Sequence, residues 1–343
     1  MDCHVSPRVA YWTSAFEPGI EAIANEVALL RQRFPSSVAW GLSHRHWVLL
    51  SWRRGFCLNP RLHLLFRAAA RMLEPVFQLN HIFGSLGDWF YLQGKRRRPT
   101  VLTMTSLTPA VERPLLERVD RFVVEYPAGR EHLERLGIGT GRIRLIFPAV
   151  NLKVFCPAEA PAGPFTVLFA SSPDDESWLE ARGVPLLLEA AAYRPDMRFR
   201  LLWRPWGSGL ARVRRWIEER GLRNVELLVG YWKDMARQYN AAHVTVAPFT
   251  DMERSKVAPN SLVESLACGR PVLVTEPVGL ADLVREAGVG VVSPASGAAL
   301  AERLDELQAE WPRYSQPARR LAERWFGADQ FLRDYHRLYS ELL

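Results

Sequence analysis

Residues 259–274 have the sequence PNSLVESLACGRPVLV, which predicts a helix followed at once by a buried strand. Pro259 favours the first turn of a helix, and the side chain of Asn260 or Ser261 can cap that turn. Apolar residues then recur at helical spacing, and Gly269 ends the helix. The next apolar residues suit a strand inside a parallel sheet. A helix beside a parallel strand is typical of an α/β domain.

The start of this helix is suited to an anion and a sugar. The first backbone N–H groups of a helix have no partner inside it, and they form a seat for a phosphate. Glu264 lies one turn further along, where it can accept hydrogen bonds from vicinal hydroxyls such as those of a ribose. The same residues also suit an ordinary helix of an α/β domain, so the interpretation depends on the rest of the chain.

Strand and helix patterns alternate on both sides of this stretch. Strands are predicted at residues 9–12, 38–42, 46–51, 76–80, 100–104, 121–125, 144–147, 166–170, 199–203, 225–229, 244–247 and 271–274. Helices are predicted at about 20–33, 62–73, 130–136, 185–192, 210–220, 233–241, 280–287, 300–307, 318–325 and 330–343. This alternation predicts parallel sheets covered by helices. A proline-rich linker at 148–164 and the length of 343 residues predict two domains.

The composition is that of a globular protein of the cytoplasm. The chain is 48% hydrophobic and 24% charged, and no apolar run approaches the eighteen residues of a membrane span. The N-terminus lacks an apolar signal region. The four cysteines have no CxxC spacing, which argues against a zinc site and a disulfide framework. They are Cys3, Cys57, Cys156 and Cys268.

The positive charge is concentrated in the first half. Residues 1–150 contain 20 Lys and Arg against 12 Asp and Glu, whereas the remainder is close to neutral. The predicted helix at 62–73 is basic and amphipathic, and a basic cluster follows at 95–98. Together with Trp47, Trp52 and Trp89, these residues suit an anionic membrane surface. The alternative is an arginine-rich surface without a partner.

The run at 259–274 resembles the donor-site signature of retaining nucleotide-sugar glycosyltransferases of the GT-B fold (glycosyl transferases group 1, or family 4-like). Residues 146–157 resemble the segment with which that family crosses between its domains, and residues 18–21 resemble its first glycine loop, with Gly19 as the one glycine kept. The resemblance implies two Rossmann-like domains with an interdomain cleft. The first would span residues 1–148 and regain a last helix at about 328–343, and the second would span 149–327.

The resemblance also implies which residues bind the donor. Glu264 matches the family's second acid, whereas Lys256 stands eight residues earlier in place of the first acid. A cation there favours a donor with an acidic group, such as a uronic acid, or acts on the diphosphate itself. Gly19 and the residues of the turn and helix start after Lys256 complete the expected donor-binding residues. The residues of the turn and helix start are Pro259, Asn260, Ser261 and Leu262.

The leaving diphosphate needs cations, which the family takes from the loop after the first strand of its second domain. Its Arg position holds Ser172 here, and its Lys position holds Arg182. Arg204 or Lys256 can supply the second charge. We therefore expect Arg182, Lys256 and Glu264 among the catalytic residues.

Two further residues complete the expected site. Tyr231 falls where the family borders the nucleobase. The family's histidine position in the first domain holds Thr105, which leaves His81 as the candidate beside the sugar. The acidic residues 174–176 lack Asp-x-Asp spacing, so we expect no metal and no cofactor besides the nucleotide sugar.

The resemblance implies transfer of a hexose-type sugar from UDP or GDP to a glycan or a lipid-linked acceptor, with retention of anomeric configuration. The enzyme would be cytoplasmic, with peripheral attachment to the inner face of the membrane. The departures at Thr105, Ser172 and Lys256 favour an alternative, a catalytically degenerate glycosyltransferase-like binding protein. Nucleic-acid binding is the least favoured hypothesis, because no platform of interleaved aromatic and basic residues is present.

Overall fold

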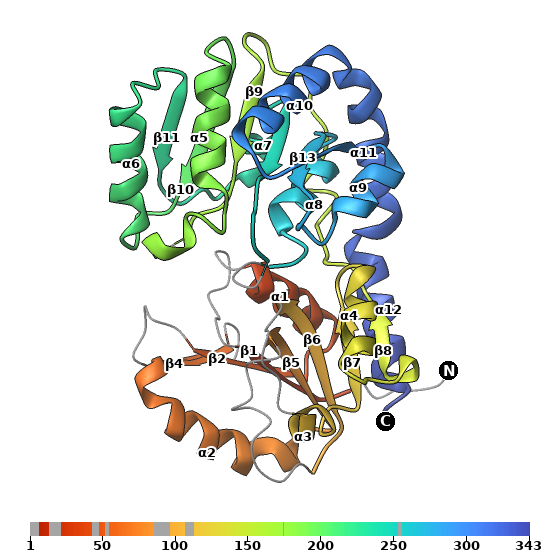
Figure 1. Cartoon of the computed structure of the whole chain (residues 1–343). Helices are drawn as coiled ribbons and strands as arrows, with labels where there is room; N and C mark the ends of the chain where they lie inside the picture. The colour runs from red at the N-terminus through yellow and green to blue at the C-terminus, as the bar shows by residue number, and fades with distance from the viewer. Residues whose placement is uncertain are drawn as a thin grey trace. The chain divides into compact units, whose positions relative to one another are not determined.

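The computed structural model describes residues 7–13, 22–42, 48–51, 55–85, 97–106, 113–173, 175–252 and 256–343. The chain divides into two compact units (Figure 1). Unit 1 consists of Met1–Phe147 with Ala328–Leu343, and unit 2 consists of Pro148–Gly327. The last helix of the chain therefore belongs to the first unit.

Unit 1 is built on an eight-stranded sheet with the order β3-β4-β2-β1-β5-β6-β7-β8. All neighbouring strands are parallel except β3 and β4. The strands are β1 (Val9–Thr13), β2 (Val38–Leu42), β3 (Val48–Ser51), β4 (Gly55–Leu58), β5 (Leu79–Ser85), β6 (Thr100–Ser106), β7 (Arg121–Val124) and β8 (Ile143–Leu145). β1 and β6 are buried along almost their whole length, as expected of parallel strands covered on both faces.

The described helices of unit 1 are α1 (Ala22–Arg33), α2 (His63–Leu73), α3 (Arg113–Leu116), α4 (Ala128–Arg135) and α12 (Ala328–Ser340). The buried residues of α12 are Phe331, Tyr335, Leu338 and Tyr339. The first three belong to the apolar stripe predicted for the C-terminal helix, whereas its fourth residue, Leu342, lies after α12 and is partly exposed. Tyr339 lies against Phe34, at the end of α1. α12 thus completes the core of unit 1.

Unit 2 has a six-stranded parallel sheet with the order β11-β10-β9-β12-β13-β14. The strands are β9 (Thr166–Phe169), β10 (Arg198–Trp203), β11 (Val225–Val229), β12 (Val244–Ala247), β13 (Val272–Thr275) and β14 (Gly290–Ser293). Counted from β9, this is the strand order of the Rossmann fold, and the order reverses between β9 and β12. In such sheets ligands bind outside the carboxyl ends of the strands at the point of reversal.

Helices flank this sheet, and α5 and α10 pack against each other. They are α5 (Val184–Tyr193), α6 (Gly209–Glu219), α7 (Met235–Asn240), α8 (Asn260–Ala267), α9 (Ala281–Ala287), α10 (Gly297–Ala309) and α11 (Trp311–Trp325). The helix and strand predicted from residues 259–274 are α8 and β13. The predicted α/β architecture of two Rossmann-like domains is confirmed.

The strand predicted at residues 76–80 is wrong in its bounds. Residues Glu74–Val76 form a short 3-10 helix that contains Pro75, and β5 begins only at Leu79 and continues to Ser85. Proline has no N–H to donate, which suits it to a helix start rather than to a central strand. His81 consequently lies inside a strand and not at its end. β4 and β14, two further short strands, were not predicted.

Within the described part of the chain, no helix combines the length and the apolarity that a membrane span requires.

Candidate functional site

The point of strand reversal in unit 2 is where the loop containing Arg182 is held. Nη1 of Arg182 donates a hydrogen bond of 2.9 Å to Oγ of Ser171, which lies just after β9. The guanidinium carbon lies 5.0 Å from the centre of the Phe249 ring, which follows β12. Arg182 therefore contacts residues that follow both strands of the reversal, at the carboxyl end of the sheet.

Gly183 explains how this loop comes so close to β12. Its φ is +64°, in the left-handed region that favours glycine. A Cβ atom at this position would lie 1.7 Å from the backbone oxygen of Pro248. Only glycine fits here, and it also precedes α5. The dipeptide Arg182-Gly183 thus fixes a cationic side chain where the Rossmann fold binds ligands.

The end of β10 is tied to the same loop through Ser172. The backbone N–H of Arg204 donates to Oγ of Ser172 over 2.8 Å, and Nε1 of Trp206 donates to the Ser172 carbonyl oxygen over 3.2 Å. The Arg204 guanidinium carbon lies 4.7 Å from the centre of the Trp206 indole. Ser172, expected from the sequence at the family's Arg position, thus anchors the backbone of another arginine, Arg204.

Tyr231 lies beside this group. Its ring meets that of Trp206 edge to face, with 6.3 Å between centres, and 47% of its surface is exposed. The backbone N–H of Gly230 donates to the carbonyl oxygen of Trp203, which keeps the loop after β11 next to the end of β10. The side chains of Trp206 and Tyr231 therefore border the loops that carry Arg182 and Arg204.

Glu264 lies in α8 and is bound from α7. The hydroxyl of Tyr239 donates to Oε2 of Glu264 over 2.7 Å. Burial raises the pKa of Glu264 to about 7, while the Tyr239 hydrogen bond and the positive charges of Lys256 and Arg204 act in the opposite direction. Lys256 and Arg204 thus act on the Glu264 carboxylate through their positive charge. Tyr239 was missed by the sequence analysis, because a pairing between two helices leaves no local signal.

The start of α8 differs in one respect from the prediction. Pro259 is the N-cap residue, and no side chain caps the helix, so the predicted cap from Asn260 or Ser261 is wrong. Oδ1 of Asn260 instead accepts a 2.6 Å hydrogen bond from Nζ of Lys256. Lys256 is therefore held one turn from Glu264. Pro259 and Leu262 are buried, whereas Asn260 and Ser261 keep part of their surface exposed.

His81 belongs to a different environment, the core of unit 1. Its Nδ1 lies 2.6 Å from the Tyr339 hydroxyl, and its Nε2 lies 2.7 Å from Oγ1 of Thr103. The side chain is fully buried, and burial lowers its pKa well below the ordinary value of 6.5. Both ring nitrogens are thus occupied by hydroxyls, as in a structural histidine. Thr105 is buried in β6, and Gly19 lies outside the described residues.

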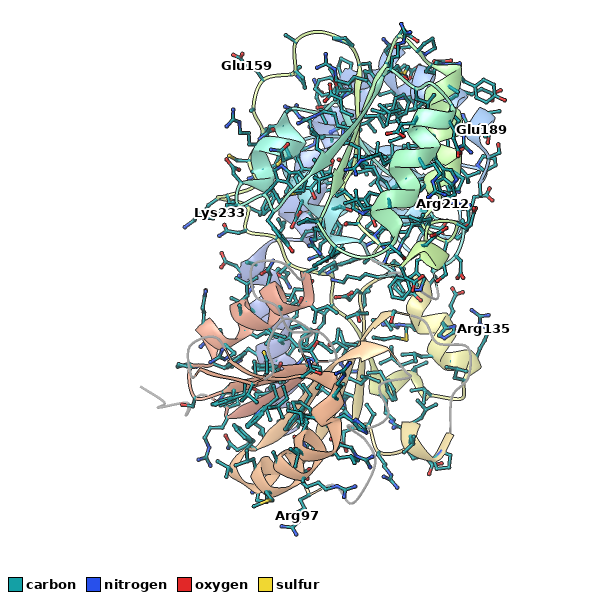
Figure 2. The ribbon with its side chains drawn as sticks, turned by 90° about the vertical axis from the view of Figure 1, so that its left-hand side faces the viewer. Arg97, Arg135, Glu159, Glu189, Arg212 and Lys233 are labelled. Carbon is teal, nitrogen blue, oxygen red and sulfur yellow. The ribbon has the colours of Figure 1, made fainter. Side chains whose placement is uncertain are left out.

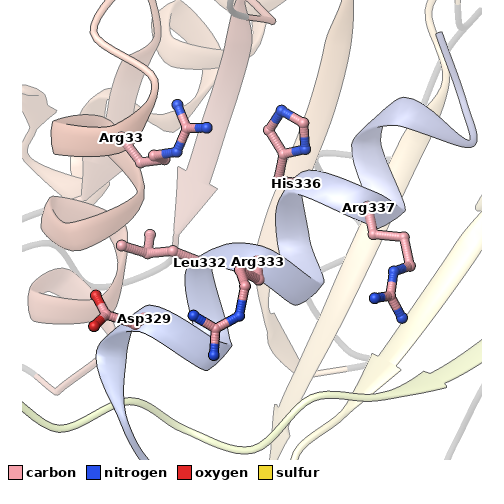
Figure 3. A pocket seen from close by; sticks show the side chains of 6 residues that line it. All are labelled: Arg33, Asp329, Leu332, Arg333, His336 and Arg337. Carbon is pink, nitrogen blue, oxygen red and sulfur yellow. The ribbon is translucent and has the colours of Figure 1, made fainter.

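Unit 1 also has a surface pocket of about 450 Å³ that contains none of the predicted residues (Figure 3). It lies between the end of α1 and one side of α12, where the His336 ring stacks on Phe34. Its lining residues are Arg33, Asp329, Leu332, Arg333, His336 and Arg337. Among the described residues, no group of three His, Cys, Asp or Glu side chains is placed to hold a metal ion.

Residues 165–310 match the model of the family "Glycosyl transferases group 1". The chain is 28% identical over 248 residues to a D-inositol 3-phosphate glycosyltransferase of Streptosporangium roseum, with 66% of this chain and 54% of that protein covered. It is 30% identical to one from a Mycobacterium species, with 66% and 51% covered. The chain thus spans about half the length of the curated relatives it matches.

Solved structures resemble the fold over nearly the whole chain. Sucrose-phosphate synthase from Thermosynechococcus elongatus has a TM-score of 0.78 at 19% identity, with 98% of this chain and 99% of that chain covered. Anabaena HepE in complex with UDP-glucose has a TM-score of 0.75 at 16% identity, with 98% and 100% covered. Residues 165–310 are thus similar to the group 1 glycosyl transferases, and the fold of the chain is GT-B.

Proposed function

We propose that the chain is a retaining glycosyltransferase that binds a UDP-sugar at the carboxyl end of the unit 2 sheet. The observation that carries this proposal is the convergence of Arg182, Arg204, Lys256 and Glu264 on that edge. Three cations and one carboxylate suit a ligand that combines a diphosphate with vicinal hydroxyls. The UDP-glucose complex of Anabaena HepE, a protein of the same fold, supports this choice of donor.

Each side chain has a distinct role in this proposal. Arg182 and Arg204 bind the diphosphate and neutralise the charge that grows as it leaves. Glu264 accepts hydrogen bonds from the ribose hydroxyls, while Tyr239 fixes the carboxylate through Oε2. Tyr231 and Trp206 border the nucleobase. Lys256 faces either the diphosphate or an acidic group of the transferred sugar.

The proposed reaction breaks the bond between the anomeric carbon of the sugar and the diphosphate oxygen. A bond forms on the same face between that carbon and a hydroxyl oxygen of the acceptor. The acceptor proton passes to an oxygen of the leaving diphosphate, so that the products are the glycoside and the protonated nucleoside diphosphate. The protein contributes positioning and positive charge, and its own residues do not form a covalent intermediate.

The acceptor is proposed as a class only, a glycan or a lipid-linked hydroxyl compound. This chain covers only about half the length of the D-inositol 3-phosphate glycosyltransferases, so their acceptor is not assigned to it.

A panel of UDP- and GDP-sugars tests the proposal by isothermal titration calorimetry and by release of nucleotide. We expect one nucleotide to bind, and slow hydrolysis of the matching donor. Glu264→Ala should weaken binding about tenfold or more, because a buried hydroxyl left unpaired costs about 1–3 kcal/mol. Glu286→Ala, an exposed carboxylate of α9, is the matched control.

The degenerate alternative makes a different prediction for the same panel. A protein that only binds would show nucleotide affinity sensitive to Glu264→Ala, but neither hydrolysis nor transfer. The substitution of the family's acid by Lys256 is the observation that favours it. Failure of every nucleotide to bind would contradict both hypotheses.

A further inference from the structure

Helix α2 of unit 1 leaves its large apolar side chains in solvent. Leu64 is 66% exposed, Leu65 is 63% exposed and Met72 is 79% exposed. Phe66 is the only buried residue among the eleven of this helix. Val76, just after the helix, is 53% exposed. Figure 1 shows α2 at the periphery of unit 1. An amphipathic helix that packs on a core would bury its apolar face instead.

These exposed residues form one face of the helix. Residues 64, 68 and 72 are spaced by four, and residue 65 lies beside them, so their side chains line one surface. Phe66 points roughly to the opposite side, into unit 1. We call the surface formed by Leu64, Leu65, Ala68 and Met72 the α2 apolar face; all four are exposed. Because α2 contacts the core through Phe66, the α2 apolar face is turned toward solvent.

The charged residues of α2 and of the turn before it have one sign. Arg61, Arg67 and Arg71 lie on α2 or in the turn before it, and no acidic residue occurs between residues 55 and 73. Glu74, which follows, is buried, and its Oε1 accepts a 2.9 Å hydrogen bond from Nδ2 of Asn80. It is thus removed from the surface.

Two more arginines are fixed next to the end of α2. Nη2 of Arg98 donates to the carbonyl oxygen of Pro75 over 3.0 Å, and the backbone N–H of Arg97 donates to Oε1 of Glu74 over 3.1 Å. The side chain of Arg97 projects away from the ribbon (Figure 2). Arg97 and Arg98 thus add positive charge where α2 ends. Trp47, Trp52 and Trp89, expected on the same surface, lie outside the described residues.

We propose that the α2 apolar face and its arginines dock onto an anionic lipid bilayer. Leucine and methionine side chains at this position enter the boundary between headgroups and acyl chains, while the arginines bind lipid phosphates. A second copy of the chain is a poorer occupant, because a symmetric contact would bring two arginine-rich faces together. A nucleic acid would leave the exposed aliphatic side chains without a partner. This inference does not depend on the proposed function.

Sedimentation of the full chain with vesicles tests the proposal. Phosphatidylglycerol–phosphatidylcholine vesicles are compared with pure phosphatidylcholine, each at low and at physiological salt. We expect binding to the anionic vesicles to be stronger by about tenfold or more, and to weaken as salt increases.

Two sets of variants separate the apolar and the charged contributions. Leu64→Ser with Leu65→Ser and Met72→Ser should reduce binding to anionic vesicles about tenfold or more, and Arg67→Glu with Arg71→Glu should abolish it. The matched controls lie in unit 2. They are Val154→Ser with Tyr193→Ser, which are 54% and 52% exposed, and Arg214→Glu with Arg215→Glu on α6.

Circular dichroism and thermal denaturation show that each variant is folded, and UDP binding measured without vesicles separates this proposal from the proposed function. Loss of vesicle binding with unchanged UDP affinity would support the docking surface. The proposal is overturned if the wild type binds both vesicle types equally or not at all. It is also overturned if the α2 variants behave like their controls, or if they dissociate a dimer instead.

Discussion

The hydroxyl of Tyr239 donates a 2.7 Å hydrogen bond to Oε2 of Glu264, joining α7 to the helix that resembles the donor signature. Tyr239 is buried, and burial raises its pKa well above the ordinary value, so it remains a proton donor at neutral pH. The carboxylate is consequently fixed in orientation before any ligand arrives. A preorganised acceptor of this kind reduces the entropy lost when ribose hydroxyls bind.

The affinity for UDP-glucose should depend on pH through Glu264. Burial raises the pKa of this carboxyl to about 7, so the ionised form, which accepts hydrogen bonds best, increases as pH rises through 7. Affinity should therefore rise with a midpoint near pH 7. Tyr239→Phe removes a hydrogen bond that lowers the pKa, and should move the midpoint upward. Calorimetry over a pH series measures both midpoints, and Glu264→Gln, which cannot ionise, should flatten the curve. An unshifted midpoint in Tyr239→Phe would count against this coupling.

Arg182→Gln should reduce turnover much more than it reduces stability. The charge that Arg182 offers is needed most when the diphosphate leaves, and loss of one such contact typically costs a hundredfold or more, about 2.7–4 kcal/mol. Rates with the donor identified by calorimetry, together with thermal denaturation, make the comparison.

Arg324→Gln is the matched control for Arg182→Gln, because this arginine also lies against an aromatic ring, that of Trp325 at 4.9 Å. Arg324→Gln should change neither the turnover nor the stability strongly. Equal rates in the two variants would remove Arg182 from the proposed site.

Gly183→Ala should destabilise unit 2 strongly and weaken donor binding. The new Cβ would collide with the carbonyl oxygen of Pro248, so the loop that carries Arg182 must move away from β12. Gly221→Ala provides the control, since its φ is +62° but its Cβ would meet nothing within 4 Å. It should cost only the left-handed conformation, about 1–2 kcal/mol. Chemical denaturation with both variants checks the difference, and equal losses would mean that the close approach to Pro248 carries no weight.

Stability should fall as the medium becomes acidic, partly through His81. Its pKa in the folded chain is far below 6.5, so below about pH 6.5 the unfolded chain binds a proton that the folded chain does not. Each such proton contributes a slope of up to about 1.4 kcal/mol per pH unit. His81→Gln should reduce the slope of unfolding free energy between about pH 7 and 5, while exposed His63→Gln should retain it. UDP affinity should stay unchanged in His81→Gln, whereas a donor-site role would lower it.

Local sequence patterns were sufficient to predict most helices and strands, because these patterns depend on the spacing of residues within a few turns. Leu262, Leu266 and Ala267 predicted the buried side of α8, and all three are buried. The strand order of unit 2 has no local signal, since β9 and β12 are brought together by packing across many residues. The prediction that His81 ends a strand was wrong for a local reason. Residues Glu74–Val76, which include Pro75, form a 3-10 helix, so β5 begins only at Leu79 and His81 lies inside it.

The sequence allowed single residues of the candidate site to be proposed, but not the interactions that join them. Glu264, Lys256 and Arg204 were selected individually, whereas their proximity to one another, and the bond from Tyr239, depend on four different elements. Ser172 illustrates the limit. Because the resembling family has an arginine at this position, Ser172 indicated the loss of a cation. Its hydroxyl nevertheless anchors the backbone of Arg204 and so positions another cation. Tertiary hydrogen bonds of this kind are decided by the fold and not by the sequence neighbours.

Helix α12 has a consequence for synthesis on the ribosome. Tyr335 and Tyr339, which pack against His81, are translated only after the whole of unit 2. Unit 2 can close its sheet and begin to fold while its residues emerge, whereas unit 1 lacks part of its interior until α12 has emerged. The nascent strands of unit 1 must wait through the translation of unit 2. The end of unit 1 that forms first is therefore exposed longest to chaperones and proteases.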